Sequence, residues 1–240
     1  MQKNVEKMTI NYSPNFNSIK RSKNKIKYLI FHYTGMKNDK LAIKKLTNNN
    51  SNVSCHYYIT KMGKLIKMVP DLYIAWHAGD SAWKKDKFLN KYSIGIEISN
   101  TGHDHFYEKF TKRQINCLIK LKKILIKKYN IKKKYILGHS DIAPIRKKDP
   151  GEKFPWKFLS KKNIGVWHKL NSKRCKSLRS ELVPHKIDVF LKKIKKFGYK
   201  TNHINSNELK KIIKSFQRRF RPELVNGKLD KECLEIIKSL

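Results

Sequence analysis

The sequence Ile26-Lys27-Tyr28-Leu29-Ile30-Phe31-His32-Tyr33-Thr34 is a short, mostly apolar run that is followed directly by Gly35. Apolar runs of this length, bounded by a turn residue, are typical of strands that are buried inside a sheet. We therefore predict a buried strand over residues 26–34, with His32 close to its C-terminal end.

Four further strands are predicted downstream of this one. Two runs at 55–60 and 64–69 are joined around Lys61-Met62-Gly63, which indicates a β-hairpin. Residues 92–99 and 135–138 are also strand-like, and the last of these runs leads into His139. The sheet is therefore expected to have at least five strands, two of them in a hairpin.

The clearest helix is predicted over residues 111–129. Thr111 can cap it, and Gln114 occupies the capping-box position three residues later. Apolar residues then recur at helical spacing: Ile115, Leu118, Leu121, Leu125 and Tyr129. A shorter helix, capped by Asn38 or Asp39, is expected to run through Leu46. Because helices alternate with strands and a hairpin is also present, we predict an α/β fold with a mixed central β-sheet flanked by helices.

The two ends of the chain have different patterns. Residues 1–25 are polar and weakly patterned, so we expect an arm that becomes ordered on contact. Residues 161–178 are predicted to be a linker with a short helix, and three amphipathic helices follow at 187–197, from near Ser206 to 220, and from Asp230. We therefore predict a catalytic domain over 1–172, with its core at about 26–158, and a separate small three-helix bundle over 180–240.

The chain is strongly basic, with 56 lysines and arginines against 18 acidic residues and a net charge of +38. One interpretation is a polyanionic partner, and the other is the lysine-rich composition that an AT-rich genome produces. The lysines are spread evenly, and the aromatic residues fall in strands and motifs rather than along a basic stripe. We therefore expect no nucleic-acid partner. No run approaches the roughly 18 to 20 apolar residues that span a bilayer, so no transmembrane segment is expected.

The four cysteines are about 60 residues apart and form no C-x-x-C pair: Cys55, Cys117, Cys175 and Cys233. This spacing indicates neither a zinc knuckle nor a disulfide framework. We expect each cysteine to be a small buried apolar residue.

Three residues have the composition of a catalytic metal site. His32 and His139 each end a predicted strand, and Asp149 follows ten residues later in a proline-rich loop. Two imidazoles and a carboxylate would leave one tetrahedral position of a zinc ion open for water. The alternative is that each histidine is satisfied within the core, and the spacing by itself leaves that alternative open.

Six motifs occur in the order found in one enzyme family: Phe31-His32-Tyr33-Thr34, Ser54-Cys55-His56-Tyr57-Tyr58-Ile59, Ala75-Trp76-His77-Ala78-Gly79, Ser93-Ile94-Gly95-Ile96-Glu97, Gly138-His139-Ser140-Asp141-Ile142-Ala143-Pro144, and Arg146-Lys147-Lys148-Asp149-Pro150-Gly151. In these motifs the chain resembles the type 2 N-acetylmuramoyl-L-alanine amidases over about residues 26–158. That resemblance implies an α/β fold related to the peptidoglycan recognition proteins. It also implies a hydrolase that cleaves the amide between N-acetylmuramic acid and L-alanine by a zinc-activated water.

The resemblance assigns roles to individual residues. His32, His139 and Asp149 match the ligands of one zinc ion per chain. Glu97 matches the acidic residue that moves the proton, and Lys147 matches the lysine that stabilises the oxyanion. The alternatives are a strand-face carboxylate for Glu97 and a solvated lysine for Lys147.

Three further residues are expected to bind substrate: His56, Trp76 and His77. A structural role remains open for His56, and a role as a rival zinc ligand remains open for His77. Some relatives have a tyrosine where this chain has Cys55, to which we assign no catalytic role. The expected partners are peptidoglycan or muropeptides, and we expect a monomer. A protein that binds muropeptides without cutting them would be expected to have lost a zinc ligand.

The C-terminal bundle resembles the three-helix peptidoglycan-binding domain of wall hydrolases. The similarity rests on three short stretches: Phe197-Gly198-Tyr199, Phe216-Gln217-Arg218-Arg219-Phe220-Arg221-Pro222 and Asn226-Gly227-Lys228-Leu229-Asp230. A bundle that only buttresses the catalytic domain is the alternative. The substrate and a wall-binding domain favour the cell envelope, the periplasm or secretion, whereas residues 1–8 lack the apolar region of a secretory signal, which favours the cytoplasm.

Overall fold

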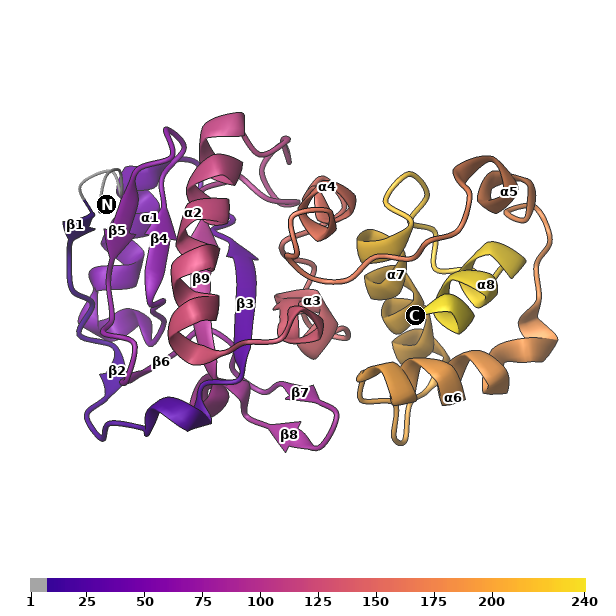
Figure 1. Ribbon diagram of the computed structural model, residues 1–240, viewed down its shortest axis with the longest axis horizontal. Helices are drawn as coiled ribbons and strands as arrows, with labels where there is room; N and C mark the ends of the chain where they lie inside the picture. Colours follow the sequence, from indigo (N-terminus) through magenta and orange to yellow (C-terminus); the bar gives the residue numbers. More distant parts are fainter. Residues whose placement is uncertain (1–7) are drawn as a thin grey trace.

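The computed structural model describes residues 8–240, so the first seven residues of the predicted N-terminal arm lie outside the described part. Within that part, the main sheet has six strands in the order β1-β5-β4-β9-β3-β10 (Figure 1). The strands are β1 (Thr9–Ile10), β3 (Tyr28–Tyr33), β4 (Tyr57–Ile59), β5 (Leu65–Lys67), β9 (Ser93–Ile98) and β10 (Ile136–Gly138). Strands β4 and β5 form the predicted antiparallel hairpin, and the other neighbours are parallel. The predicted mixed sheet is confirmed.

Strand β3, which lies between β9 and the edge strand β10, divides its side chains between two apolar layers. Leu29 and Phe31 belong to the layer beneath helix α2 (Lys112–Tyr129), which covers one face of the sheet (Figure 1). Tyr28 and Ile30 belong to the layer on the opposite face. Since side chains alternate along a strand, His32 lies on the same face as Tyr28 and Ile30, away from α2.

Local capping signals set the helix boundaries as the sequence predicted. The Thr111 hydroxyl accepts the backbone N–H of Gln114, and the Gln114 side chain in return accepts the backbone N–H of Thr111. Helix α1 (Asp39–Thr47) begins after Asn38, whose side chain accepts the backbone N–H of Leu41. Together with residues of the hairpin, α1 forms a small apolar cluster on the face opposite α2.

The N-terminal arm is more ordered than its polar sequence indicates. Strand β1 extends the main sheet, and β2 (Phe16–Asn17) pairs with β6 (Ile74–Ala75). Ser13, Asn15 and Arg21 are buried, and their side chains donate hydrogen bonds to backbone carbonyls of distant segments. This arm is held by polar contacts, which an apolar periodicity does not reveal.

The remaining elements lie between the sheet and the C-terminus. They are β7 (Ala82–Trp83), β8 (Asp86–Lys87), α3 (His139–Ile142), α4 (Trp156–Ser160), α5 (Ser172–Ser177), α6 (Ile187–Phe197), α7 (Ser206–Phe220) and α8 (Lys231–Ser239). Short 3₁₀ turns cover Lys23–Lys25, Asn49–Ser51, Leu89–Tyr92, Lys133–Tyr135 and Pro184–Lys186. Throughout the described chain, each helix is too short or too polar to cross a lipid bilayer.

The C-terminal helices α6, α7 and α8 form the predicted bundle, but they do not enclose a core of their own. Phe190 and Phe216 of the bundle belong to the same apolar cluster as Tyr28 and Leu137 of the sheet. Trp83 of the β7–β8 hairpin packs in the same cluster, and the centre of its ring lies 5.2 Å from the centre of the Tyr199 ring. In Figure 1, α7 is the bundle helix on the side of α3 and α4. The bundle therefore shares its apolar core with one face of the sheet.

Candidate metal centre and active site

The register of the sheet places two of the predicted site residues side by side. His32 on β3 is paired with Glu97 on the parallel neighbour β9, and both lie near the C-terminal ends of their strands. His139 follows the last residue of β10, the next strand on the other side of β3. The site therefore forms where open α/β sheets generally bind ligands, at the carboxyl ends of parallel strands.

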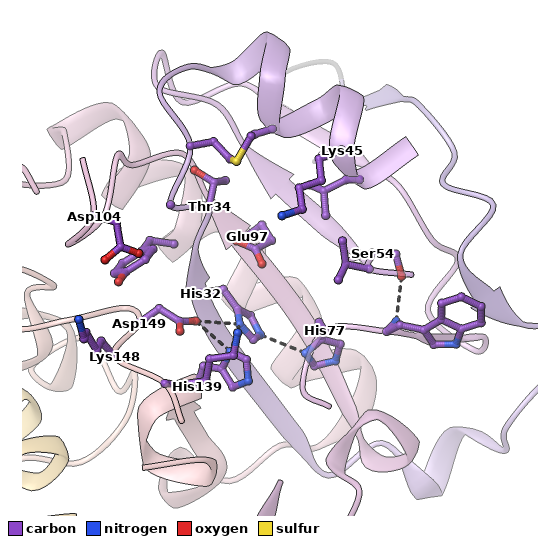
Figure 2. A pocket seen from close by; sticks show the side chains of 18 of the residues that line it. His32, Thr34, Lys45, Ser54, His77, Glu97, Asp104, His139, Lys148 and Asp149 are labelled. Atoms are coloured by element: carbon purple, nitrogen blue, oxygen red, sulfur yellow. Dashed lines mark hydrogen bonds and ion pairs between the residues drawn. The ribbon is translucent and has the colours of Figure 1, made fainter. Parts of the chain in front are cut away.

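Asp149 completes a tight cluster with the two histidines (Figure 2). The Nδ1 atoms of His32 and His139 lie 3.0 Å apart, and each lies 3.0 Å from Oδ2 of Asp149. All three side chains are buried. A tetrahedral zinc ion with bonds of roughly 2.0 to 2.1 Å holds its ligand atoms about 3.3 Å apart, which is close to this spacing.

Hydrogen bonds outside the cluster fix the protons of His32. The Ser93 hydroxyl donates to the carbonyl of Leu89 at 2.6 Å, so its oxygen is left to accept from Nε2–H of His77 at 3.1 Å. The bare Nδ1 of His77 then accepts from Nε2–H of His32, at 3.0 Å. The Nδ1 of a neutral His32 therefore carries a lone pair that is directed at the cluster.

A hydrogen bond outside the cluster also fixes the position of the proton on His139. Nε2 of His139 lies 3.1 Å from the carbonyl oxygen of Ala78, which can only accept, so the proton of a neutral ring is on Nε2. Two bare nitrogens and a carboxylate oxygen thus converge at 3.0 Å with no proton between them. Three acceptors in this arrangement fit a bound cation, and the N₂O donor set fits zinc with one open position.

Burial and mutual repulsion keep the His32 ring neutral. Burial is the larger cause, and the neighbouring His139 adds to it. Together they lower the pKa of His32 to about 4. Burial alone would raise the pKa of Asp149, but the two histidines outweigh it and hold that pKa below its usual range. At neutral pH both groups are therefore in the protonation state that binds a metal.

Glu97 presents a carboxylate oxygen that has no hydrogen-bond donor among the described residues. That oxygen, Oε2, is buried, and the side chain lines a cavity of about 500 Å³ beside the cluster. Burial raises the pKa of Glu97 well above its ordinary value, Asp149 raises it further, and Lys147 and Lys45 oppose the shift. A desolvated carboxyl group of this kind is suited to proton transfer.

The cavity brings together most of the predicted site residues and leaves one out. His32, Trp76, His77, Glu97, His139, Lys147 and Asp149 line it. His56 does not: it is completely buried, and its Nδ1 accepts the backbone N–H of Gly95 at 3.0 Å. The expectation that His56 contacts substrate therefore has no support in the structure, because its ring is used to hold strand β9.

His77 reaches the cavity, but both of its ring nitrogens are engaged by His32 and Ser93. Its Nδ1 faces Nε2 of His32 rather than the metal cluster, so a role as a rival ligand is not what this geometry favours. The ring packs so closely over β9 that a Cβ at Gly95 would lie 2.4 Å from its Cγ. Glycine is therefore required at position 95.

Sequence reasoning missed two features of this site. Lys45 of α1 lines the cavity and is directed toward its Glu97 side (Figure 2); as one lysine among many, it gave no signal. Nδ1 of His103 lies 2.8 Å from the hydroxyl of Tyr33, which lines the cavity, and Nε2 lies 3.0 Å from a carboxylate oxygen of Glu152. No motif marked His103, because its contacts join segments far apart in the sequence.

The cysteines agree with the prediction made from their spacing. All four are buried. Cys55 lies outside the cavity lining, and burial raises the pKa of its thiol well above the ordinary value. The thiol is therefore in its unreactive, protonated form.

The cluster of His32, His139 and Asp149 lies with Glu97 inside residues 22–152, which match the family model described as N-acetylmuramoyl-L-alanine amidase. The chain is 35% identical over 232 residues to the N-acetylmuramoyl-L-alanine amidase AmiD of Escherichia coli K12. This match covers 90% of this chain and 82% of AmiD. It is also 37% identical over 110 residues to the 1,6-anhydro-N-acetylmuramyl-L-alanine amidase AmpD of Haemophilus influenzae. That match covers 45% of this chain and 58% of AmpD.

Solved structures extend the similarity through the C-terminal bundle. E. coli AmiD, in complex with the substrate anhydro-N-acetylmuramic acid-L-Ala-D-γ-Glu-L-Lys, superposes with a TM-score of 0.81 at 33% identity, covering 93% of this chain and 91% of AmiD. AmpDH3 of Pseudomonas aeruginosa superposes with a TM-score of 0.80 at 30% identity, covering 97% of each chain. On the family match and the similarity to AmiD along most of both chains, this chain belongs to the N-acetylmuramoyl-L-alanine amidase family.

Proposed function

We propose that this enzyme hydrolyses the amide bond between N-acetylmuramic acid and L-alanine with the help of one zinc ion. The observation that carries the proposal is the convergence of three unprotonated acceptor atoms, on His32, His139 and Asp149, beside the unpartnered Glu97 carboxylate. Zinc held there would act as a Lewis acid and lower the pKa of water to about 7.

The residues of the chain would divide the remaining chemistry between them. Glu97 accepts a proton from the attacking water and passes it to the departing amine of L-alanine. Lys147 carries positive charge at the cavity wall and stabilises the negative charge that develops on the carbonyl oxygen. The charge of Lys147 also lowers the pKa of His32, which supports its placement close to the reacting centre.

The substrate is proposed to be a muropeptide or the corresponding part of peptidoglycan. AmiD is the protein whose complex contains an anhydro-muropeptide, and its fold matches this chain through both the sheet and the bundle. The cavity of about 500 Å³ is large enough for a sugar with the first residues of a stem peptide. Trp76 lies on its wall and offers an apolar surface for this ligand.

Product analysis tests this function. Purified protein loaded with zinc is incubated with soluble anhydro-muropeptides, with reducing-end muropeptides and with intact sacculi, and the products are identified by mass. We expect stem peptides that begin with a free L-alanine amine, and release that is slower by at least about 10² with the Glu97→Gln variant. Metal-loaded protein that releases no peptide from any of the three substrates would refute the proposal.

We also propose that the bundle α6–α8 binds the wall polymer, on the basis of the three motif stretches that it shares with wall-binding domains. The test uses full-length Glu97→Gln, which is expected to digest its target at least about 10² more slowly, in a sacculus pull-down at 1 M salt, where the Debye length is about 3 Å. A saturating soluble muropeptide occupies the active site in a parallel sample. Retention that persists with the muropeptide supports a second binding surface, and retention that disappears assigns all binding to the cavity.

A further inference from the structure

Asp141 lies at the contact between the active site and the C-terminal bundle and is bonded to both. It lies two residues after His139, in the short helix α3 (His139–Ile142), and its side chain is 1% exposed. Its Oδ2 accepts the backbone N–H of Gly138 at 2.7 Å, directly before the histidine. The Asp141 carboxylate therefore holds the backbone on which the metal-binding His139 is mounted.

Three residues of the bundle region hold this helix from the other side. The Tyr199 hydroxyl donates to Oδ1 of Asp141 at 2.6 Å, and Nη1 of Arg219 donates to Oδ2 in a buried ion pair. The Ser215 hydroxyl donates to the backbone carbonyl of Ser140 at 2.6 Å. Ser140 and Asp141, the two residues that follow His139, are thus both bonded to the bundle region.

Arg219 connects both ends of the segment that carries the histidine. Besides its pair with Asp141, its Nη2 donates to the carbonyl of Ile136 at 3.2 Å, at the start of β10. Its guanidinium lies 4.2 Å from the centre of the Trp156 ring. The planar guanidinium is therefore fixed by contacts on three sides, and it spans the strand before His139 and the turn after it.

The bundle also reaches the segment of the carboxylate ligand. Arg218 of α7 forms an ion pair of 3.7 Å with Glu152, three residues after Asp149. Inside the site, the backbone N–H of Ser140 donates to the carbonyl of Asp149 at 2.8 Å. The two ligand-bearing segments are thus bonded to each other, and helix α7 contacts both.

We propose that Tyr199, Ser215 and Arg219 are positioning residues for His139, so that the C-terminal bundle sets the affinity of the active site for its metal. The inference rests on the zinc site proposed above. Metal affinity depends on ligand placement to within roughly 0.5 Å, and the partners behind metal ligands typically alter metal affinity by about 10- to 100-fold. The bundle is in this respect part of the catalytic machinery as well as a candidate wall-binding surface.

The experiment removes single hydroxyl groups from the full-length protein, so that the shape of the interface is kept. Tyr199→Phe deletes the bond to Asp141, and Ser215→Ala deletes the bond to Ser140. Tyr129→Phe is the matched control, because its hydroxyl also donates to a buried aspartate, Asp71, at 2.6 Å but lies outside the cavity lining. For each protein, the zinc dissociation constant is measured by competition with a chromogenic chelator, and the melting temperature is measured for the metal-free form.

We expect Tyr199→Phe and Ser215→Ala each to weaken zinc binding by about 3- to 10-fold, less than the loss of a direct partner of a metal ligand, because they act through Asp141 and Ser140. The double variant should weaken it further. Tyr129→Phe should lower the melting temperature comparably and leave zinc affinity within twofold of the parent protein. The inference is overturned if the Tyr199 and Ser215 variants bind zinc as the control does. If the parent protein itself binds no zinc, the metal-dependent function fails instead, so the two failures can be distinguished.

Discussion

Nε2 of His32 lies 3.0 Å from Nδ1 of His77, on the side of the His32 ring opposite the metal cluster. Because His77 is in turn anchored through Ser93 to the carbonyl of Leu89, it accepts the proton of His32 and orients that ring. His77, which lines the cavity as predicted for a substrate-binding residue, is therefore also the partner of a proposed metal ligand.

His77→Leu removes this acceptor and should weaken zinc binding by about 10- to 100-fold. His77→Asn places an acceptor oxygen near the position of Nδ1 and should restore most of the affinity. Zinc affinity is measured by chelator competition for both variants. Equal affinity of His77→Leu and the parent protein would show that the hydrogen bond does not orient His32.

Metal content is the most direct check of the cluster itself. We expect about one zinc ion per chain in the purified protein, because the two imidazoles and the carboxylate converge on one position that a single ion can occupy. His139→Ala should lose both the metal and the activity, since only two ligands remain. Elemental analysis and a muropeptide assay measure the two effects. Full activity in a protein shown to be metal-free would exclude a zinc mechanism.

Glu97→Gln keeps the shape of the side chain and removes its ability to carry a proton. General acid–base catalysis is worth about 10² to 10⁴ in rate, so kcat should fall by at least about 10² while zinc is retained. A variant that turns over at the parental rate would show that another group is the base.

Lys147→Met tests the charge at the cavity wall. We expect a loss of about 10² to 10³ in kcat, as for the removal of one oxyanion donor. Lys161→Met is the control, because it removes the same charge from an exposed position outside the cavity. If both variants lose the same modest fraction of activity, the effect comes from net charge rather than from contact with the reacting carbonyl.

Asp71 provides a stability prediction that is independent of the metal. Its carboxylate accepts the hydroxyls of Tyr57 and Tyr129 at 2.6 Å each, and it pairs with Lys67 and Lys128. Burial alone would raise the pKa of Asp71, but these donors outweigh it and hold the pKa below its usual range. A carboxyl group with a lowered pKa in the folded state stabilises the protein above its unfolded pKa of about 4, and this contribution is lost as the pH falls through the folded value.

Asp71→Asn should therefore lower the free energy of unfolding by about 1.5 to 3 kcal/mol at pH 7, the range for hydrogen bonds to a charged group. The difference between the two proteins should shrink as the pH is lowered below about 4. Urea unfolding at pH 7 and at pH 3 measures this. A difference that grows toward low pH would have the wrong sign for a stabilising carboxylate.

Local signals predicted those parts of the molecule whose structure is decided within a few residues. The Thr111 capping box, the 61–63 turn and the apolar run at β3 each fix one element by short-range chemistry. The cluster of His32, His139 and Asp149 depends on long-range contacts, since His32 and Asp149 are 117 positions apart. Their spacing left a core role open for the histidines, and the ordered motifs favoured the metal site.

Long-range polar contacts account for what the sequence did not reveal. Arg21 is buried in the N-terminal arm because its guanidinium donates to the carbonyls of Asp71 and Asn90. Likewise, the apolar stripe of α7 indicates that one face is buried, but it does not indicate what covers that face. Tyr199 and Arg219 reach Asp141 across 58 and 78 positions, and no periodicity encodes such a pairing.

The apolar core that the sheet and the bundle share predicts that the protein does not tolerate removal of the bundle. Deletion of residues 180–240 would uncover Tyr28, Ile30, Trp83 and Leu137, each at most 2% exposed in the full chain. At about 1.5 to 3 kcal/mol for each large apolar side chain, the loss is on the order of 6 to 12 kcal/mol. That is comparable to the entire stability of a typical domain, about 5 to 15 kcal/mol.

The deletion also leaves the buried Asp141 carboxylate without Arg219, and the loss of one partner of a buried pair costs about 3 to 5 kcal/mol. We therefore expect the truncated protein to aggregate or to lose its zinc, and to leave soluble muropeptides uncleaved. Size-exclusion chromatography, zinc analysis and the soluble-substrate assay measure these outcomes in one preparation. A truncated protein that remains monomeric, binds zinc as the full chain does and cleaves soluble muropeptide at the parental rate would restore the separate-domain interpretation, because the sheet would then be stable and active without the face that covers it.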